Sequence, residues 1–290
     1  MSRTGEHRAA VPGGSLYYTT RGTGPVLLIM GGGPSNADTL EPLASRLAAD
    51  FTVVTYDRRG YSRSQAEEPA GPELARIQRH ADDARRLIAA LGTGLVAVFG
   101  TSFGALIALE LAATAPAAVG GPLVVHEPPL GQMLAGDERD AFALKLDQED
   151  AGAALNAIAA SVGVSRGGGR GGGRGGPGTG PVPADVELFI RRDAPAIGGY
   201  HVDLDRLRPM AGRLTVTGSE DSQGFYPYEC ARRLAAQLGL SLAELPGNHA
   251  GMIAQPAEFA ARLRGLLCPP ASGDAAGIGE DTPAFEEVTR

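Results

Sequence analysis

The sequence predicts an α/β protein with a doubly wound, mostly parallel sheet and a small helical cap insertion. Short apolar, β-branched runs alternate along the chain with longer segments of helical pattern, as in repeated strand–helix–strand units. This alternation breaks between about residues 130 and 208 and then resumes. The break therefore predicts an insertion into the sheet rather than a separate domain at one end of the chain.

The first half of the chain contains most of the expected strands. Residues 26–30 (Val-Leu-Leu-Ile-Met) are continuously apolar, which is typical of a strand buried on both faces of a parallel sheet. The strands expected here cover residues 15–20, 26–30, 51–56, 96–99 and 122–126. Helices are expected over 39–49 and 80–91, and from about residue 103 onward.

The second half begins with the insertion and then returns to the strand–helix alternation. Residues 137–162 are rich in alanine and prone to form helix, and a short helix is expected over 185–193. Beyond it, strands are expected over 213–217 and 241–245, and helices over 227–238 and 255–267. We therefore assign residues 1–129 and 209–268 to the core, residues 130–208 to a cap, and residues 269–290 to a disordered tail.

An arginine- and glycine-rich run lies inside the insertion, over residues 166–181. Ordering such a run would cost much backbone entropy and bury little surface, so we expect a flexible loop. The alternative is an RGG-like nucleic-acid tract. Three arginines without interleaved aromatic residues, in an acidic chain, argue against that alternative.

The composition bounds the class of protein and its setting. The chain has 290 residues, 43% of them hydrophobic, and a formal net charge of −7, which argues against nucleic acid or an anionic membrane as its main partner. Two cysteines, Cys230 and Cys268, are too few for a disulfide framework. With no secretory signal visible and no apolar run of about 18 residues, we expect a cytoplasmic protein.

The segment Gly100-Thr-Ser102-Phe-Gly104 stands between an expected strand and an expected helix. This is the context of a G-x-S-x-G nucleophile elbow, in which a strained corner exposes a serine hydroxyl. Gly100 and Gly104 leave room for the tight turn, and the following helix directs its free N–H groups toward the site. The alternative is an ordinary glycine-rich turn between strand and helix, and the placement favours a nucleophile.

A serine nucleophile needs a base, and the base needs an orienting acid. His249 follows an expected strand and lies between Gly247 and Gly251, which favours it as the base over a loop histidine without a role. Asp221 follows another strand end, and we prefer it to Glu220 as the orienting acid. Glu127 is a fallback, although a structural carboxylate before two prolines is the favoured interpretation.

An acyl-transfer site also needs hydrogen-bond donors for the oxyanion. The N–H of Phe103 is one candidate, and one of Gly31, Gly32 and Gly33 after the first buried strand would supply the second. The sequence Gly-Gly-Gly-Pro matches neither a dinucleotide-binding motif nor a phosphate-binding loop with its lysine. Nucleotide binding is therefore not expected.

Together these segments resemble the α/β-hydrolase superfamily, over roughly residues 15–267. The resemblance implies Ser102 as nucleophile, His249 as base and Asp221 as orienting acid, in the chain order of that fold. It also implies Gly32 and Phe103 as oxyanion donors, although Met30-Gly31 stands where the family usually has His-Gly.

The predicted function is a serine hydrolase that cleaves an ester-like bond of a small organic substrate through an acyl-enzyme. Thioester, lactone or C–C bond hydrolysis and cofactor-free perhydrolysis are alternatives on the same triad, and a non-catalytic ligand-binding protein is a remote one. No metal or organic cofactor is expected, because no His/Cys cluster has ligand spacing. The side chains that would line the pocket, unless they are ordinary core, are Phe103, Met133, Phe142, Leu146, Phe189, Phe225 and Met252.

Overall fold

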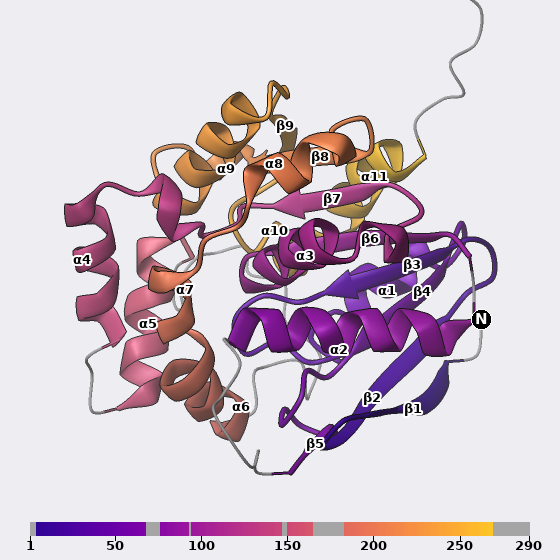
Figure 1. The fold of residues 1–290 in the computed structure, drawn as a ribbon. Helices are drawn as coiled ribbons and strands as arrows, with labels where there is room; N and C mark the ends of the chain where they lie inside the picture. Colours follow the sequence, from indigo (N-terminus) through magenta and orange to yellow (C-terminus); the bar gives the residue numbers. More distant parts are fainter. Residues whose placement is uncertain (1–3, 68–75, 93, 147–149, 165–182, 269–290) are drawn as a thin grey trace, which may run out of the picture.

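A computed structural model describes residues 4–67, 76–92, 94–146, 150–164 and 183–268 (Figure 1). Its centre is a nine-stranded sheet of order β1-β2-β4-β3-β6-β7-β8-β9, with β5 paired to β2. From β4 to β9 along this order, neighbouring strands are parallel. Strand β2 is antiparallel to both of its neighbours, β1 and β4. The strands are β1 (Gly5–Val11), β2 (Gly14–Arg21), β3 (Val26–Met30), β4 (Thr52–Tyr56), β5 (Gln65–Ala66), β6 (Val96–Thr101), β7 (Leu123–His126), β8 (Leu214–Ser219) and β9 (Ala243–Leu245).

Helices cover both faces of the sheet, as the parallel strands require. One face packs against α1 (Glu41–Leu47) and α11 (Pro256–Leu267). The other face packs against α2 (Arg76–Leu91), α3 (Phe103–Thr114) and α9 (Tyr226–Gln237). Short α8 (Leu204–Leu207) lies beside α3, and α10 (Gly251–Ala254) precedes α11 (Figure 1).

The central strands show why their sequence is apolar at every position. All five residues of β3 are buried, and successive side chains enter opposite layers of the core. Leu28 and Met30 join the cluster under α2 and α3, whereas Leu27 and Ile29 join the cluster under α1 and α11. Helix α3 is buried along its whole length except at Thr114, so it lacks the polar face of a surface helix.

The predicted fold class is confirmed, and the expected strands and helices are present with shifted ends. Residues 137–162 form two helices, α4 (Gly136–Leu146) and α5 (Ala151–Ser161), and 185–193 lies within α6 (Pro183–Leu188) and the π-helical η3 (Phe189–Asp193). The antiparallel edge strand β1 and the short β5 are present in addition to the expected strands. The Arg/Gly-rich run at 166–181 and the tail at 269–290 lie outside the described residues.

Between β7 and β8 the chain leaves the sheet and forms α4, α5, α6, η3 and α7 (Pro195–Gly199), here called the cap helices. They gather beyond the carboxyl ends of the parallel strands, at the left of Figure 1. Three hydrogen bonds made by side chains of these helices and of Tyr200, which follows α7, tie this segment to the core. Asp193 accepts from Tyr61 (2.6 Å), Tyr200 donates to Glu110 (2.8 Å), and Asp185 accepts from the backbone of Ser62 (2.8 Å).

Two further properties concern the helices and the cysteines of the described residues. None of their helices has both the length and the apolar character needed to cross a membrane. Cys230 is buried, Cys268 is exposed, and both are free thiols.

Candidate active site

Ser102 occupies the corner between β6 and α3. Its backbone angles are φ 53° and ψ −121°, a conformation that costs energy for a residue with a side chain and that persists only where the surroundings enforce it. The Ser102 N–H donates to the carbonyl of His126 on the next strand (2.9 Å). The predicted strand–turn–helix context of Ser102 is therefore present, strain included.

Three glycines make room for this corner. A Cβ atom at Gly104 would lie 2.1 Å from the carbonyl oxygen of Met30, and one at Gly100 would lie 2.6 Å from that of Gly104. A Cβ atom at Gly32 would lie 2.6 Å from the Cβ of Ser102. These distances are shorter than real Cβ contacts, so the strand ends and the elbow approach this closely only with glycine at these positions.

His249 lies in the loop between β9 and α10 and is held by a carboxylate. Its Nδ1 lies 2.5 Å from Oε2 of Glu127, and the Glu127 side chain is completely buried. The other carboxylate oxygen of Glu127 accepts the backbone N–H of Ser219 (2.7 Å). With Nδ1–H donating to Glu127, the Nε2 atom of His249 is left free to accept a proton.

The expected pairing of His249 with Asp221 is wrong. Asp221 is exposed after β8, and only its backbone N–H approaches the histidine loop, donating to the carbonyl of Gly247 (2.9 Å). Glu220 is exposed as well. The carboxylate comes instead from the end of β7, where Glu127 adopts a positive φ of 45° as the chain turns away from the sheet.

The surroundings of Glu127 favour its ionised form. Burial by itself would raise the pKa of this carboxyl, but the hydrogen bond with His249, the nearby imidazoles and the N–H of Ser219 outweigh it and lower the pKa. His126 stacks near His249 with ring centroids 6.4 Å apart and is fully buried. Burial lowers the pKa of His126 to about 4, partly opposed by Glu127, so this imidazole is neutral near pH 7.

His126 is held by hydrogen bonds of its own and acts as a structural histidine. Its Nδ1 lies 3.0 Å from Oγ1 of Thr217, and its Nε2 lies 3.3 Å from Oγ of Ser219. Both partners belong to β8. His126 therefore fixes the relative positions of the β7 and β8 ends that carry Glu127 and its N–H donor.

The glycine loop that follows β3 lies beside Ser102. Gly32 lies directly against Ser102, and its carbonyl accepts the N–H of Ser35 (3.0 Å). Gly33, with φ 45°, lines the cavity beside the serine. Phe103 is the first residue of α3, so its N–H has no acceptor within the helix.

The side chain of Arg58 holds this loop in place through hydrogen bonds. Its guanidinium donates to the carbonyls of Gly31 (2.9 Å) and Gly33, and it lies over the ring of Tyr61, 4.3 Å from the centroid. Asp57 accepts the N–H of Ala37 (2.8 Å) at the end of the same loop. Asp57 and Arg58 therefore have a structural role and hold the loop in place.

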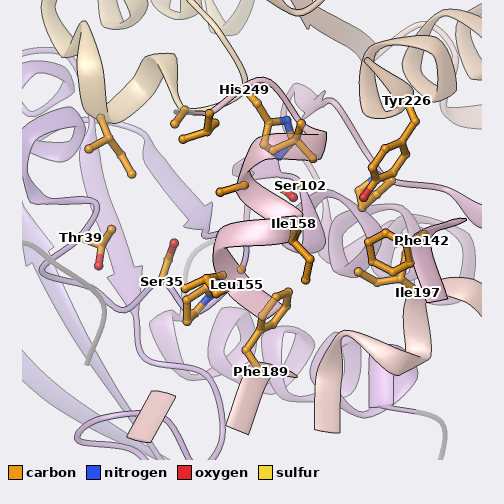
Figure 2. Close-up of a pocket in the computed structure, with 18 residues that line it drawn as sticks. Ser35, Thr39, Ser102, Phe142, Leu155, Ile158, Phe189, Ile197, Tyr226 and His249 are labelled. Atoms are coloured by element: carbon orange, nitrogen blue, oxygen red, sulfur yellow. The ribbon is translucent and has the colours of Figure 1, made fainter. Parts of the chain in front are cut away.

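Ser102 and His249 open into one cavity of about 320 Å³ between the sheet and the cap helices (Figure 2). Its wall is mostly aliphatic and aromatic and contains no Asp, Glu, Lys or Arg among the described residues. Residues that line it include Gly33, Ser35, Thr39, Phe142, Leu155, Ile158, Phe189, Ile197, Tyr226 and Ile253.

Of the side chains expected in the pocket, Phe142 and Phe189 line the cavity. Phe103, Met133 and Met252 pack within the two core clusters instead. The Leu146 side chain is outside the described part of the structure. Within the described ranges, no group of three or more His, Cys, Asp or Glu residues is arranged to hold a metal ion.

The sheet order, the serine elbow and the histidine–carboxylate pair define a hydrolase of the α/β class. Residues 25–159 match the sequence model of the alpha/beta hydrolase fold family. A curated relative, the uncharacterized hydrolase YraK of Bacillus subtilis, is 33% identical over 263 residues, covering 89% of this chain and 94% of YraK. The chain therefore belongs to the α/β-hydrolase superfamily, as its motifs indicated, and it is an enzyme of that class.

Solved structures agree on the fold. The esterase RhEst1 from Rhodococcus sp. ECU1013 is similar with a TM-score of 0.64 and 20% identity, over 92% of this chain and 98% of RhEst1. The N-acyl homoserine lactonase AidH has a TM-score of 0.64 and 18% identity, over 95% of this chain and all of the AidH chain. At these identities the similarity concerns the fold alone.

Proposed function

We propose that this chain is a serine hydrolase that cleaves an ester-like bond of a small, uncharged, largely apolar substrate through an acyl-enzyme. The observation that carries the proposal is the placement of a strained Ser102 and a carboxylate-paired His249 in the wall of one apolar cavity. A serine hydroxyl is a weak nucleophile without a positioned base, and a histidine whose Nδ1 is engaged by a buried carboxylate is such a base.

In the proposed reaction, Oγ of Ser102 attacks the ester carbonyl carbon while Nε2 of His249 takes the hydroxyl proton. Glu127, and not Asp221, keeps Nδ1–H oriented and stabilises the imidazolium that forms. The imidazolium then gives its proton to the departing alcohol oxygen. A water molecule attacks the acyl-enzyme with His249 again as base, releasing the carboxylic acid and restoring Ser102.

The oxyanion is assigned to two backbone N–H groups. Phe103 offers the first N–H of α3, where the positive end of the helix dipole lies. For the second donor we choose Gly33 over the expected Gly32, because Gly33 lines the cavity whereas Gly32 packs against the Cβ of Ser102.

The cavity supports a restricted substrate class. No charged side chain among its described lining residues would pair with a charged substrate, and a buried unpaired charge is strongly unfavourable. The proposal keeps a cytoplasmic setting, supported by the two free thiols, and a small-molecule partner rather than nucleic acid.

The test is active-site labelling of the purified protein with a fluorophosphonate, followed by peptide mass analysis. Label confined to Ser102, and lost in Ser102→Ala, is the expected result. Turnover of a panel of p-nitrophenyl esters, thioesters and lactones then ranks the acyl substrates, which tests ester cleavage against thioester and lactone hydrolysis. A folded, monodisperse sample without labelling or turnover would overturn the acyl-enzyme mechanism and favour a ligand-binding role.

A further inference from the structure

We propose that the hydroxyl of Tyr226 is a specificity determinant that donates a hydrogen bond to an uncharged oxygen in the acyl arm of the substrate. The inference rests on the proposed function and deepens it, because it names the chemistry of the group that the cavity accepts. It starts from the position of Tyr226, the first residue of α9, whose side chain lines the cavity.

The ring of Tyr226 is fixed by packing. It meets Phe142 of α4 edge to face, with ring centroids 5.6 Å apart. Figure 2 shows the hydroxyl at the end of the ring that points inward, on the side of Ser102 where Phe142 and Ile197 also lie. The cap therefore holds the phenol in one orientation toward the site.

The hydroxyl of Tyr226 has no hydrogen-bond partner among the described residues. Tyr61, Tyr200 and Tyr228 each donate to a carboxylate, of Asp193, Glu110 and Glu244 respectively. The buried hydroxyl of Tyr56 also lacks a partner, but Tyr56 does not line the cavity. Tyrosine hydroxyls in buried positions normally find a partner, and one left open in a cavity is a donor available to a ligand. Burial also raises the pKa of the Tyr226 phenol, so it keeps its proton throughout the working range of an enzyme.

The two ends of the cavity differ, and this assigns the Tyr226 end to the acyl arm. Phe142 and Ile197 at that end are each less than 5% exposed, so the end is closed. Ile253 is 43% exposed, which places an opening near α10. During acyl transfer the acyl arm stays bound while the alcohol leaves and water enters, so the acyl arm belongs in the closed end and the alcohol toward the opening.

The experiment compares p-nitrophenyl hexanoate with esters of the same length in which an ether oxygen replaces one chain methylene at successive positions. Each kcat/KM is divided by the alkaline hydrolysis rate of that ester, which removes differences in intrinsic reactivity. The measured quantity is the selectivity of the enzyme for each oxygen-containing chain over the hexanoyl chain. The test variant is Tyr226→Phe, which removes only the hydroxyl.

The matched control is Tyr228→Phe in the same helix, whose hydroxyl bonds to Glu244 and does not line the cavity. We expect Tyr226→Phe to lower the selectivity about 5- to 10-fold at one chain position, the value of one hydrogen bond, and Tyr228→Phe to leave it unchanged. Equal selectivity in wild type and Tyr226→Phe at every position would overturn this inference alone. Absence of turnover and of Ser102 labelling would overturn it together with the proposed function.

Discussion

The carboxyl of Glu127 is both buried and ionised, two conditions that normally oppose each other. It is completely buried, which disfavours a charge, and yet it has to be ionised to hold the imidazole of His249. The N–H of Ser219 and the imidazole together satisfy both carboxylate oxygens. A buried carboxylate with both oxygens engaged is rigid as well as charged, and rigidity is what an orienting group requires.

Glu127→Gln should lower kcat by about 10²- to 10⁴-fold with little change in KM, because the amide leaves the imidazole without its orienting charge. The measurement is steady-state hydrolysis of the best ester in the panel. Asp221→Asn is the control, and its activity should stay within about twofold of wild type because the side chain is exposed. The reverse pattern would reinstate Asp221 as the orienting acid.

His126 gives the folded state a defined dependence on pH. Its pKa is lowered from 6.5 to about 4 by burial, so between these values the unfolded chain binds a proton that the folded chain does not. The free energy of unfolding is therefore highest above pH 6.5 and falls as the pH drops toward 4.

The loss attributable to His126 over this window is about 3 kcal/mol, from 1.36 kcal/mol for each pKa unit. Urea unfolding of wild type and His126→Gln at several pH values measures it. The difference in slope between the two proteins should be confined to pH 4–6.5. Parallel curves across that range would show that His126 is not held neutral in the folded state.

At the scale of elements, β3, β6 and α3 meet with very little space between their backbones. The elbow brings helix backbone against the end of β3 with no room for a methyl group at Gly104. This close approach places Ser102 beside the glycine loop. The backbone packing that stabilises the fold at this point therefore also positions the serine.

Gly104→Ala should destabilise the protein by about 3 kcal/mol, the upper range for overpacking, because the new Cβ would meet backbone rather than a flexible side chain. The control is Gly265→Ala in α11, where no atom outside the local helix backbone lies within 4 Å of the new Cβ and a gain of about 0.5–1 kcal/mol is expected. Urea unfolding measures both. Equal stabilities of the two variants would contradict the close approach at the elbow.

The elements that the sequence predicted well share one property: their local pattern matches their burial. β3 is apolar throughout and β6 is apolar up to Phe99, and both strands are buried throughout. β1, Gly5–Val11, has mostly polar or exposed residues at the sheet edge, so its sequence lacks that pattern. Two helices replace the single Ala-rich stretch at 137–162, because composition shows helix propensity but not where a chain reverses.

Within the site, local motifs predicted Ser102 and His249 as candidates, and the choice of carboxylate failed. Glu127 and His249 are 122 positions apart in the chain, and their contact depends on the β7–β8 pairing and on the turn at φ 45°. Neither can be read from a short sequence window. Glu127 did meet the criterion applied to Asp221, a carboxylate just after a strand, and only the direction of the side chain separates the two.

At the scale of the whole molecule, Asp193 connects the cap helices to core residues that lie next to the glycine loop. It lies in the π-helical turn η3 and is within 2.7 Å of Arg76, 3.1 Å of His80 and 3.8 Å of Arg58. Burial by itself would raise the pKa of Asp193, but His80, Arg58 and Arg76 lower it, so the carboxylate is charged. Since Arg58 also holds the carbonyls of Gly31 and Gly33, cap seating and the glycine loop depend on one ion cluster.

Asp193→Asn should therefore destabilise the protein by about 3–5 kcal/mol, because buried Arg58 loses its counter-charge. We also expect kcat to fall while the enzyme is still folded, since the loop that presents Gly33 loosens. Asp205→Asn, at an exposed pair with Arg208, should change stability by less than about 0.5 kcal/mol. An unchanged kcat in folded Asp193→Asn would show that the contacts of Asp193 with the core do not position the glycine loop.

The origin of Glu127 from β7 divides the proposed triad unevenly along the chain. Ser102 and Glu127 precede residue 164, and only His249 follows residue 183, on a portion held to the rest by the β7–β8 pairing. A break in the chain between these two points would leave nucleophile and acid on one fragment and the base on the other. Ester cleavage by such a nicked protein would then require the two fragments to reassociate. The enzyme could therefore be divided at this point to build a split reporter.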